Sequence, residues 1–303
     1  MPKLLLLTKK PDDYSRLLEA AHLPKLDIVT APSADCEIVF GAPNLIGDVL
    51  PLLPDLKWVQ AMWAGVEPLL DPALRRDYIL TNARGVFGPL MSEYVFGYLL
   101  LHERKIFQRY ASQQKNLWDA TVTGTLREKT IGLLGVGSIG AHLASTAKHF
   151  GMTVHGFTRA SESCPDVDVY FHTDISSFAK NLDYLICVLP NTNATRHIVD
   201  ASVLKSLPAH ALFINVGRGN AVDESALAEV LVSGQIAGAV LDVFQQEPLP
   251  ADHIFWRTPN LFITSHTAAP SFPKDVSDLF IENYQRFLRG ETLKYQVDFQ
   301  KGY

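Results

Sequence analysis

Short apolar runs alternate with helical patterns along the whole chain. Before residue 130, the apolar runs cover residues 4–7, 26–29, 37–40 and 58–62, with helical spacing at 12–21. After residue 130, they cover residues 131–134, 153–157, 184–188, 211–215, 236–241 and 260–264, with helical spacing at 224–232. Strands that alternate with helices are typical of α/β folds with parallel sheets. Six strands from residue 131 onward predict a doubly wound, Rossmann-type sheet.

Two longer helical patterns indicate how the chain is divided. The first covers residues 91–109 and precedes a polar stretch at 113–128, so it is a candidate connector between domains. The second covers residues 276–288 and follows Pro270 and Pro273, and it is too long for a loose tail. With 303 residues, the chain is long enough for two domains of ordinary size.

A glycine motif links a predicted strand to a predicted helix. Gly135, Gly137 and Gly140 form the pattern Gly-x-Gly-x-x-Gly. In a dinucleotide site, the first glycine permits a tight turn, the second lets the backbone approach a pyrophosphate, and the third lets helix and strand pack closely. Ser138 and Ile139 lie inside the motif, at the helix start whose N–H groups face the phosphates. A turn without a ligand is the alternative, but the flanking strands and helix favour a dinucleotide site.

The end of the next strand predicts which dinucleotide binds. NAD sites usually carry an Asp or Glu about 20 residues after the glycines, which binds the ribose 2′-hydroxyl. This chain reads Phe157-Thr158-Arg159-Ala160-Ser161 there, without a carboxylate. A hydroxyl at Thr158 and a guanidinium at Arg159 suit a 2′-phosphate, because arginine offers a planar fork of donors with a fixed positive charge. NADP(H) is therefore favoured. If Arg159 is an ordinary solvated residue, NAD(H) also binds.

Composition and charge exclude several classes of protein. Hydrophobic residues make up 47% of the chain and charged residues 19%, as in a globular protein with a large core. The formal charge of −5 argues against a nucleic-acid surface, and the sequence has no polybasic patch or membrane-length apolar segment. Residues 4–7 are too short for a signal-peptide core. Cys36, Cys164 and Cys187 stand far apart, so neither a disulfide framework nor a zinc site is expected, and the cytoplasm is the expected compartment.

Polar side chains follow the last predicted strands, one group after each. In chain order they are Arg218 between two glycines, Asp242 with Glu247, and His266. Taken singly, they read as a surface arginine, loop acids and a loop histidine. Ligands of open α/β sheets bind beyond the carboxyl ends of the strands, where these residues stand. Beside a nicotinamide, they supply a carboxylate clamp, an orienting acid and a proton donor, which suits the reduction of a 2-keto acid.

Several motifs resemble one enzyme family over nearly the whole chain. They are Trp-Val-Gln-Ala-Met-Trp-Ala-Gly-Val-Glu at 58–67, Gly-Pro-Leu-Met-Ser-Glu-Tyr at 88–94, the glycine motif, Leu-Pro-Asn-Thr at 189–192, Asn-Val-Gly-Arg-Gly at 215–219, Asp-Val-Phe-Gln-Gln-Glu-Pro at 242–248, and His266. The chain resembles the D-isomer-specific 2-hydroxyacid dehydrogenases, most of all their short glyoxylate/hydroxypyruvate reductase branch. The resemblance implies an oxidoreductase that reduces a small 2-keto acid, such as glyoxylate or hydroxypyruvate, to the D-2-hydroxy acid.

The resemblance also implies roles for individual residues. The catalytic set would be Arg218, Glu247 and His266. Substrate contacts would come from Arg218 and from the loop formed by Trp63, Ala64, Gly65 and Val66. Cofactor contacts would come from the glycine motif with Thr158 and Arg159, and from Met91, Leu189, Pro190, Val216 and Asp242, the last at the nicotinamide amide.

The same resemblance implies a split domain. Residues 1–97 and 273–303 would form a smaller, flavodoxin-like α/β substrate domain. Residues 98–272 would form a Rossmann cofactor domain inserted into it. Family members pair through their cofactor domains, so a homodimer is expected, with the helical residues 91–109 and the aromatic-rich residues 110–118 at the interface.

Two other activities on the same scaffold are alternatives. One is a dinucleotide-sensing corepressor of the C-terminal-binding-protein type, but this chain has no obvious interaction tails and its catalytic positions are filled. The other is a formate-type dehydrogenase, which carries Gln where Glu247 stands. The chain departs from the family at Ala268-Ala269, where many members carry glycine, and at the bulky Trp63. These departures leave the pocket shape and the preferred substrate length open.

Overall fold

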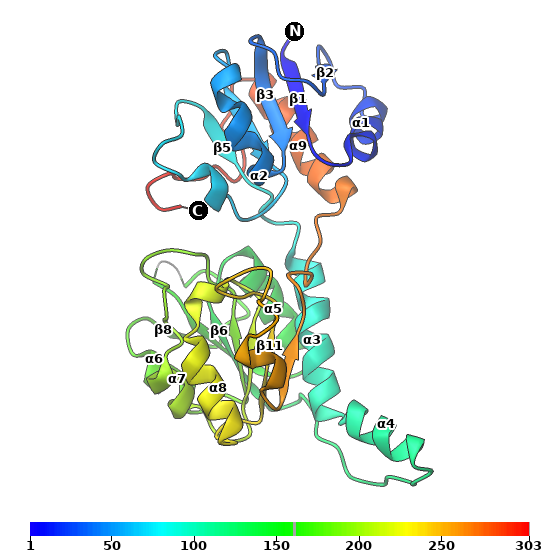
Figure 1. Ribbon diagram of the computed structural model, residues 1–303, viewed down its shortest axis with the longest axis vertical. Coiled ribbons are helices and arrows are strands. Elements are labelled where there is room, and N and C mark those ends of the chain that lie inside the picture. The colour runs from blue at the N-terminus through cyan, green and yellow to red at the C-terminus, as the bar shows by residue number, and fades with distance from the viewer. Residues whose placement is uncertain (160–161, 303) are drawn as a thin grey trace. The chain divides into compact units, whose positions relative to one another are not determined.

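The chain folds as two units, each with its own parallel sheet (Figure 1). The computed structural model describes residues 1–159 and 162–302. Unit 1 comprises Met1–Val86 and Ser271–Tyr303, and unit 2 comprises Phe87–Pro270. The first boundary lies before helix α3 (Gly88–Glu103), so the whole helix belongs to unit 2, whereas the family resemblance implies a boundary after residue 97.

Within the described residues of unit 1, five parallel strands form one sheet in the order β2-β1-β3-β4-β5. The strands are β1 (Lys3–Leu7), β2 (Asp27–Val29), β3 (Cys36–Gly41), β4 (Trp58–Ala61) and β5 (Ile79–Thr81). The helical elements are α1 (Pro11–Ala20), α2 (Pro43–Ile46), α9 (Pro273–Leu288) and the 3-10 turns η1 (Gly47–Leu52) and η2 (Glu67–Leu69). The central strands β3 and β4 are almost entirely buried, which is why their sequences show no regular alternation of apolar and polar residues.

Helix α9 returns the last part of the chain to unit 1. Its Phe280 stacks on Phe40 of β3 and on Trp58 of β4, with ring centroids 4.7 and 5.1 Å apart. Asn283 of α9 donates a hydrogen bond of 3.0 Å to Gln60 of β4 inside the same unit. All of these side chains are fully buried. The core of unit 1 is therefore complete only when α9 is in place.

The part of unit 2 that the structure describes holds a seven-stranded parallel sheet in the order β12-β11-β10-β9-β6-β7-β8. The strands are β6 (Thr130–Leu134), β7 (Thr153–Phe157), β8 (Val169–Phe171), β9 (Tyr184–Cys187), β10 (Leu212–Asn215), β11 (Gly238–Leu241) and β12 (Leu261–Ile263). The predicted doubly wound α/β fold is confirmed. The sequence pattern misses only β8 among these, because its three residues are partly exposed and leave too short an apolar run.

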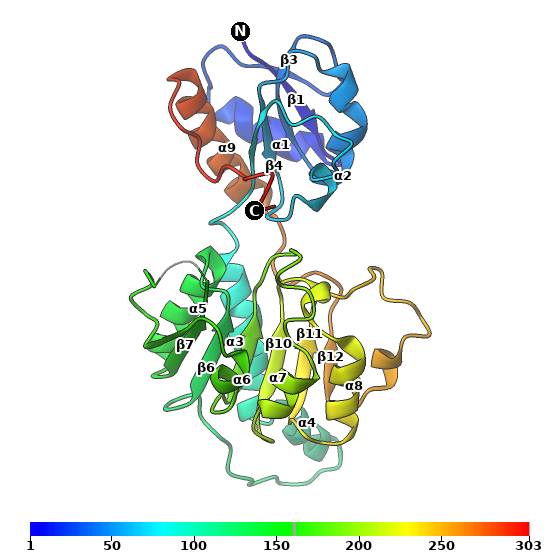
Figure 2. The same ribbon diagram turned by 90° about the vertical axis from the view of Figure 1, so that its left-hand side faces the viewer.

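Helices cover both faces of the unit 2 sheet (Figure 2). They are α3 (Gly88–Glu103), α4 (Ile106–Gln114), α5 (Ser138–His149), α6 (Ile175–Ala179), α7 (Ala201–Ser206), α8 (Glu224–Val232) and the 3-10 turns η3 (Gly219–Ala221) and η4 (Ile254–Arg257). Helices α3 and α5 share one hydrophobic cluster with the strands, and α6, α7 and α8 share another. The strand order reverses at β6, which lies between β7 and β9, and ligands of such sheets bind at this reversal.

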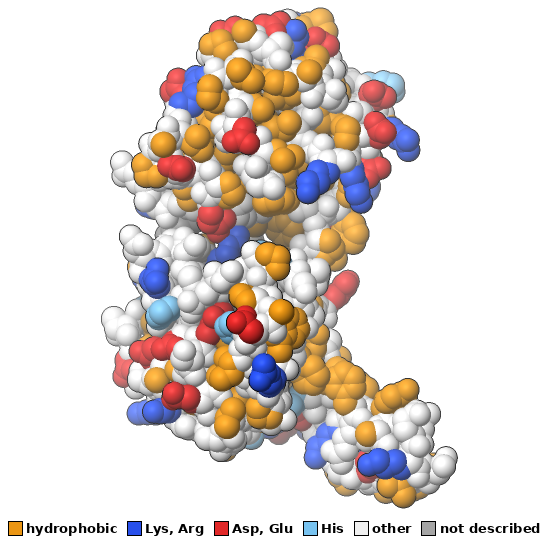
Figure 3. Space-filling view, viewed as in Figure 1, with side chains coloured by type: hydrophobic (Ala, Val, Ile, Leu, Met, Phe, Trp, Pro, Cys, Tyr) orange, Lys and Arg blue, Asp and Glu red, His pale blue; other side chains and the backbone are white. Residues whose placement is uncertain are grey.

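An arm, residues 104–123, projects from unit 2 and contains α4 (Figure 1). After the arm, the chain returns to the end of α3 at Gly124, whose backbone N–H donates to the carbonyl of Glu103 at 3.1 Å. None of the α4 residues is buried. Apolar side chains gather on the arm (Figure 3), namely Ile106, Phe107, Tyr110, Leu117, Trp118 and Val122. The sequence pattern at 91–109 predicts one helix, but the chain breaks at Lys105, whose φ of +49° ends α3 and redirects the backbone.

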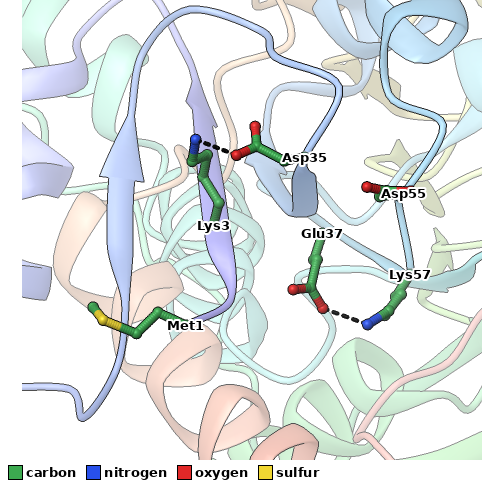
Figure 4. Close-up of a pocket in the computed structure, with 6 residues that line it drawn as sticks. All are labelled: Met1, Lys3, Asp35, Glu37, Asp55 and Lys57. Carbon is green, nitrogen blue, oxygen red and sulfur yellow. Dashed lines mark hydrogen bonds and ion pairs between the residues drawn. The ribbon is translucent and has the colours of Figure 1, made fainter.

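A surface hollow of about 310 Å³ lies at the amino ends of the unit 1 strands (Figure 4). It is lined by Met1, Lys3, Asp35, Glu37, Asp55 and Lys57. Lys3 pairs with Asp35 and Lys57 pairs with Glu37, each at 2.5 Å, so these lysines are already neutralised. This edge is opposite the carboxyl ends of the strands, where ligands of open α/β sheets bind.

Among the residues that the structure describes, no helix is long and apolar enough to span a membrane. No cluster of His, Cys, Asp and Glu side chains in those residues is arranged to hold a metal ion.

Candidate active site

The glycine turn between β6 and α5 has the geometry of a phosphate cradle. Gly135 has φ of +99°, a conformation that glycine adopts without strain, and its N–H donates to the carbonyl of Phe157 at 3.0 Å. A Cβ at Gly140 would collide with the carbonyl of Gly135, so the third glycine is required by the close packing of helix and turn. Gly137 and Ser138 are exposed at the start of α5, and a Cβ at Gly137 would meet open space. The turn therefore fits a dinucleotide pyrophosphate.

The end of β7 carries Thr158 and the exposed Arg159, while the next two residues, Ala160 and Ser161, lie outside the described part. The carbonyl of Thr158 lies 2.7 Å from Nδ1 of His172. The first acid after β7 is Glu162, and its Oε1 lies 2.6 Å from Nε2 of the same histidine. The hydrogen bond with the Thr158 carbonyl raises the pKa of His172, and the hydrogen bond with Glu162 raises it further. Sequence reasoning missed His172, because it follows the undetected strand β8.

Arg218 stands at a tight corner between β10 and η3. A Cβ at Gly217 would press on the backbone of Leu189, and one at Gly219 would collide with the backbone of Phe244. The buried Asn215 fixes the corner, since its Oδ1 accepts the Gly217 N–H at 3.1 Å and its Nδ2 donates to the Arg218 carbonyl at 3.0 Å. Packing therefore requires both glycines. The corner presents a single long side chain, that of Arg218, whose Nη1 donates to the Gly217 carbonyl at 2.8 Å.

Glu247 and His266 form a hydrogen-bonded pair. Nδ1 of His266 lies 2.7 Å from Oε2 of Glu247. The other carboxylate oxygen, Oε1, accepts the backbone N–H of Phe244 at 2.9 Å, which fixes the carboxylate facing the ring. The His266 side chain is 52% exposed and that of Glu247 is 35% exposed, so the ring is open to a ligand. The structure therefore brings two of the predicted site residues, Glu247 and His266, within hydrogen-bonding distance of each other.

Asp242 is 2% exposed and holds the loop that carries His266. Its Oδ1 accepts the hydroxyl of Thr264 at 2.5 Å and the N–H of Thr267 at 2.8 Å. Its Oδ2 accepts the N–H of Ala268 at 3.0 Å. The expected role at a nicotinamide amide is thus accompanied by a second one, the anchoring of this loop.

The loop after β4 belongs to unit 1 and is tied to the end of β5. The carbonyl of Trp63 accepts the N–H of Ala83 at 3.0 Å, and the carbonyl of Ala64 accepts Nδ2 of the buried Asn82 at 2.8 Å. Gly65 follows, and Val66 is buried. Asn82 was not among the expected site residues. The sequence feature that could have identified Asn82 is its position directly after a strand.

The remaining expected cofactor residues lie mostly in the core. Met91 of α3 and Val216 are buried in the hydrophobic cluster that α3 and α5 share with the sheet. Leu189 lies against Gly135, where its Cδ2 would meet a Cβ at 3.2 Å. The carbonyl of Pro190 accepts the hydroxyl of Thr195 at 2.7 Å. Leu189 therefore flanks the glycine turn, whereas the side chains of Met91 and Val216 belong to the core.

Comparisons with known proteins show which family the chain resembles. The sequence profile of the family described as "D-isomer specific 2-hydroxyacid dehydrogenase, NAD binding domain" matches residues 96–268. A curated relative, glyoxylate/hydroxypyruvate reductase A of Salmonella paratyphi B, is 32% identical over 256 residues, which are 82% of each chain.

Solved structures match over the full length. A D-isomer-specific 2-hydroxyacid dehydrogenase family protein of Aeromonas salmonicida has a TM-score of 0.92 and 42% identity, covering 98% of this chain and 99% of its own. An NADPH-dependent glyoxylate/hydroxypyruvate reductase of Sinorhizobium meliloti, crystallised with NADP and sulfate, has a TM-score of 0.89 and 28% identity over the whole of both chains. A dehydrogenase of Xanthobacter autotrophicus with NADPH has a TM-score of 0.88 and 31% identity, covering 99% of both chains.

Proposed function

Because the chain belongs to the D-isomer-specific 2-hydroxyacid dehydrogenase family, we propose that it reduces a small 2-keto acid to the D-2-hydroxy acid, with NADPH as the favoured cofactor. The observation that carries the proposal is the Glu247–His266 pair at 2.7 Å. It stands at the carboxyl edge of the same sheet whose β6–α5 turn fits a pyrophosphate. The reductases of Salmonella paratyphi B and Sinorhizobium meliloti support glyoxylate and hydroxypyruvate as the first substrates to test.

The residues of the chain perform every step except hydride donation, which the nicotinamide supplies when bound. Nδ1 of His266 faces Glu247, so the proton for the carbonyl oxygen is held on Nε2. The carboxylate orients the ring through this hydrogen bond. Arg218 binds the substrate carboxylate through two N–H groups and polarises the carbonyl. In unit 1, the loop formed by Trp63, Ala64, Gly65 and Val66 stays the expected source of further substrate contacts.

A panel of 2-keto acids tests this function. Glyoxylate, hydroxypyruvate, pyruvate and longer keto acids are incubated with NADPH or NADH, and cofactor oxidation is followed by absorbance. We expect turnover with the short acids and NADPH, and the chirality of the product should be D. Tight NADPH binding without oxidation by any acid would contradict the proposal and favour a dinucleotide-sensing binding protein.

Arg159→Ala should weaken NADPH selectively. Arg159 is exposed, so we expect the loss of its contact with the 2′-phosphate to raise the NADPH Kd by about tenfold, the lower end for a hydrogen bond between charged groups. The NADH Kd should not change. Fluorescence titration of both cofactors measures this. Arg127→Ala, at an exposed arginine of the same unit, is the control and should leave both values unchanged. Equal efficiency of the wild type with both cofactors would refute the preference.

We also propose that the chain is a cytoplasmic homodimer that pairs through the arm. Trp118 on the arm is 96% exposed, and the group of exposed apolar side chains around it supports this proposal. Contacts within the arm stiffen it, since Arg109 Nη2 donates to the Thr121 carbonyl at 2.6 Å and Ser112 Oγ donates to Asp119 at 3.2 Å. A preorganised arm loses little entropy when a second copy covers it. The three cysteines are all described and unpaired, which suits a reducing compartment.

Light scattering at micromolar concentration should give a mass near twice the 33.6 kDa of one chain. Tyr110→Glu with Trp118→Glu should convert the protein to monomers, because two carboxylates from each copy would be buried in the interface. Val232→Glu is the matched control, since Val232 is an exposed apolar residue of unit 2 outside the arm. A wild-type mass near 33.6 kDa would contradict the proposal.

A further inference from the structure

The backbone of His266 has an unfavourable conformation. Its φ is +55°, in the left-handed region, although histidine carries a side chain that glycine lacks. Such a conformation is uncommon for residues other than glycine, although histidine adopts it more readily than most. The hydrogen bonds around His266 show what stabilises it here.

Asp242 holds the backbone of the loop by accepting hydrogen bonds from three successive N–H groups. The N–H of His266 donates to the Asp242 carbonyl at 2.8 Å. The N–H groups of Thr267 and Ala268 donate to its two carboxylate oxygens, at 2.8 and 3.0 Å. Consecutive N–H groups that converge around a left-handed residue form a concave anion site, and here the anion is a side chain of the protein itself. The conformation of His266 thus depends on the orientation of this buried carboxylate.

Two hydroxyl groups fix the carboxylate in turn. The Thr264 hydroxyl donates its proton to Oδ1 of Asp242 at 2.5 Å. Its oxygen lies 2.6 Å from the Tyr94 hydroxyl, which must donate because the Thr264 proton is already engaged. Burial raises the pKa of Tyr94 above its usual range, so this hydroxyl keeps its proton at any working pH. The result is an ordered chain of hydrogen bonds from α3 to the loop of His266.

We propose that Thr264 and Tyr94 are positioning residues for proton transfer. They hold the Asp242 carboxylate and thereby keep the His266 imidazole within hydrogen-bonding distance of Glu247. The inference rests on the proposed function only for its kinetic readout. Neither hydroxyl needs to touch the substrate. Thr264 acts directly on Asp242, and Tyr94 acts through Thr264, so the effect should decrease along the chain.

The central experiment compares Thr264→Val with Thr264→Ser. Valine keeps the shape and removes the hydroxyl, whereas serine keeps the hydroxyl. We expect Thr264→Val to lower kcat by about tenfold, the effect of one lost hydrogen bond to a charged group, with a smaller change in the keto-acid KM. Thr264→Ser should restore most of kcat. Thr258→Val is the matched control, because the buried Thr258 hydroxyl donates to the Ile254 carbonyl at 3.1 Å away from the site, and kcat should not change.

A second readout is independent of turnover. In protein labelled at histidine Cε1, the His266 resonance is identified by its absence from His266→Gln. Thr264→Val should shift this resonance, and Thr264→Ser and Thr258→Val should leave it in place. If Thr264→Val does not fold, Tyr94→Phe decides, since phenylalanine keeps the ring contact with Tyr98 at 4.9 Å between centroids and removes only the hydroxyl.

The outcomes separate the two hypotheses. An unchanged kcat and resonance in Thr264→Val would overturn the positioning role. Equal losses in the Val and Ser variants would overturn it as well, because the hydroxyl would then not be the cause. If the resonance moves as expected but the wild type reduces no keto acid, the positioning role stands and the proposed function fails.

Discussion

Replacing His266 by Gln should lower kcat for keto-acid reduction by about a hundredfold or more. Glutamine can still donate a hydrogen bond to Glu247, but it has no proton to transfer at working pH. The NADPH Kd should stay close to the wild-type value, because the glycine turn that fits the pyrophosphate does not involve this side chain. Steady-state kinetics and a cofactor titration of the same preparation measure the two effects. Near-normal turnover would show that His266 is only a loop residue.

Glu247→Gln provides the companion measurement. The Glu247 carboxylate binds two partners, because one oxygen lies 2.7 Å from Nδ1 of His266 and the other accepts the Phe244 N–H at 2.9 Å. An amide has a single acceptor oxygen, so the glutamine can accept only one of these two hydrogen bonds and should hold the ring less firmly. We therefore expect kcat to fall by about tenfold, the effect of one lost hydrogen bond to a charged group, with little change in the NADPH Kd. An unchanged kcat would show that the pair does not contribute to turnover.

Replacing Arg218 by Lys should act on the substrate. An ammonium cannot reproduce the two-point contact of a guanidinium with a carboxylate. We expect kcat/KM for the keto acid to fall by about thirtyfold to a hundredfold, equivalent to about 2–3 kcal/mol, mainly through KM. Initial rates over a range of keto-acid concentrations at saturating NADPH measure the split between KM and kcat.

The corner around Arg218 makes this variant interpretable. Gly217 and Gly219 are held by contacts with the backbones of Leu189 and Phe244, so the lysine would occupy the same position. Arg257→Lys, at an exposed arginine of the same unit, should leave the kinetics unchanged. A drop in kcat without any rise in KM would place Arg218 in the chemical step rather than in binding.

Much of the candidate site could be predicted, because the order of the strands along the chain determines which residues reach the carboxyl edge of the sheet. In a parallel sheet, residues that follow the strands all reach the carboxyl edge, so Arg218, Glu247 and His266 could be located from strand patterns alone. Positions that only glycine fits, such as Gly135 and Gly140, can also be recognised from the sequence. The fold class is confirmed, and the roles of the site residues stay predictions until the variants are measured.

The missed features depend on contacts between distant segments. Asn215, Asn82 and Thr264 are short polar residues at strand ends, and their partners are backbone groups or side chains that only the folded chain brings near. The break at Lys105 is missed for a different reason. Nothing in the identity of a lysine signals a left-handed φ, so two helices were merged into one pattern.

Because Phe280 of α9 stacks on Phe40 and Trp58, unit 1 can complete its core only after the last helix has been synthesised. During synthesis, unit 2 is continuous and can fold as soon as Pro270 has left the ribosome, whereas unit 1 must wait for α9. Until then, the aromatic face of β3 and β4 is exposed on a nascent chain. That interval is when chaperones would be most needed, and a chain released before α9 is made would keep this face open to aggregation.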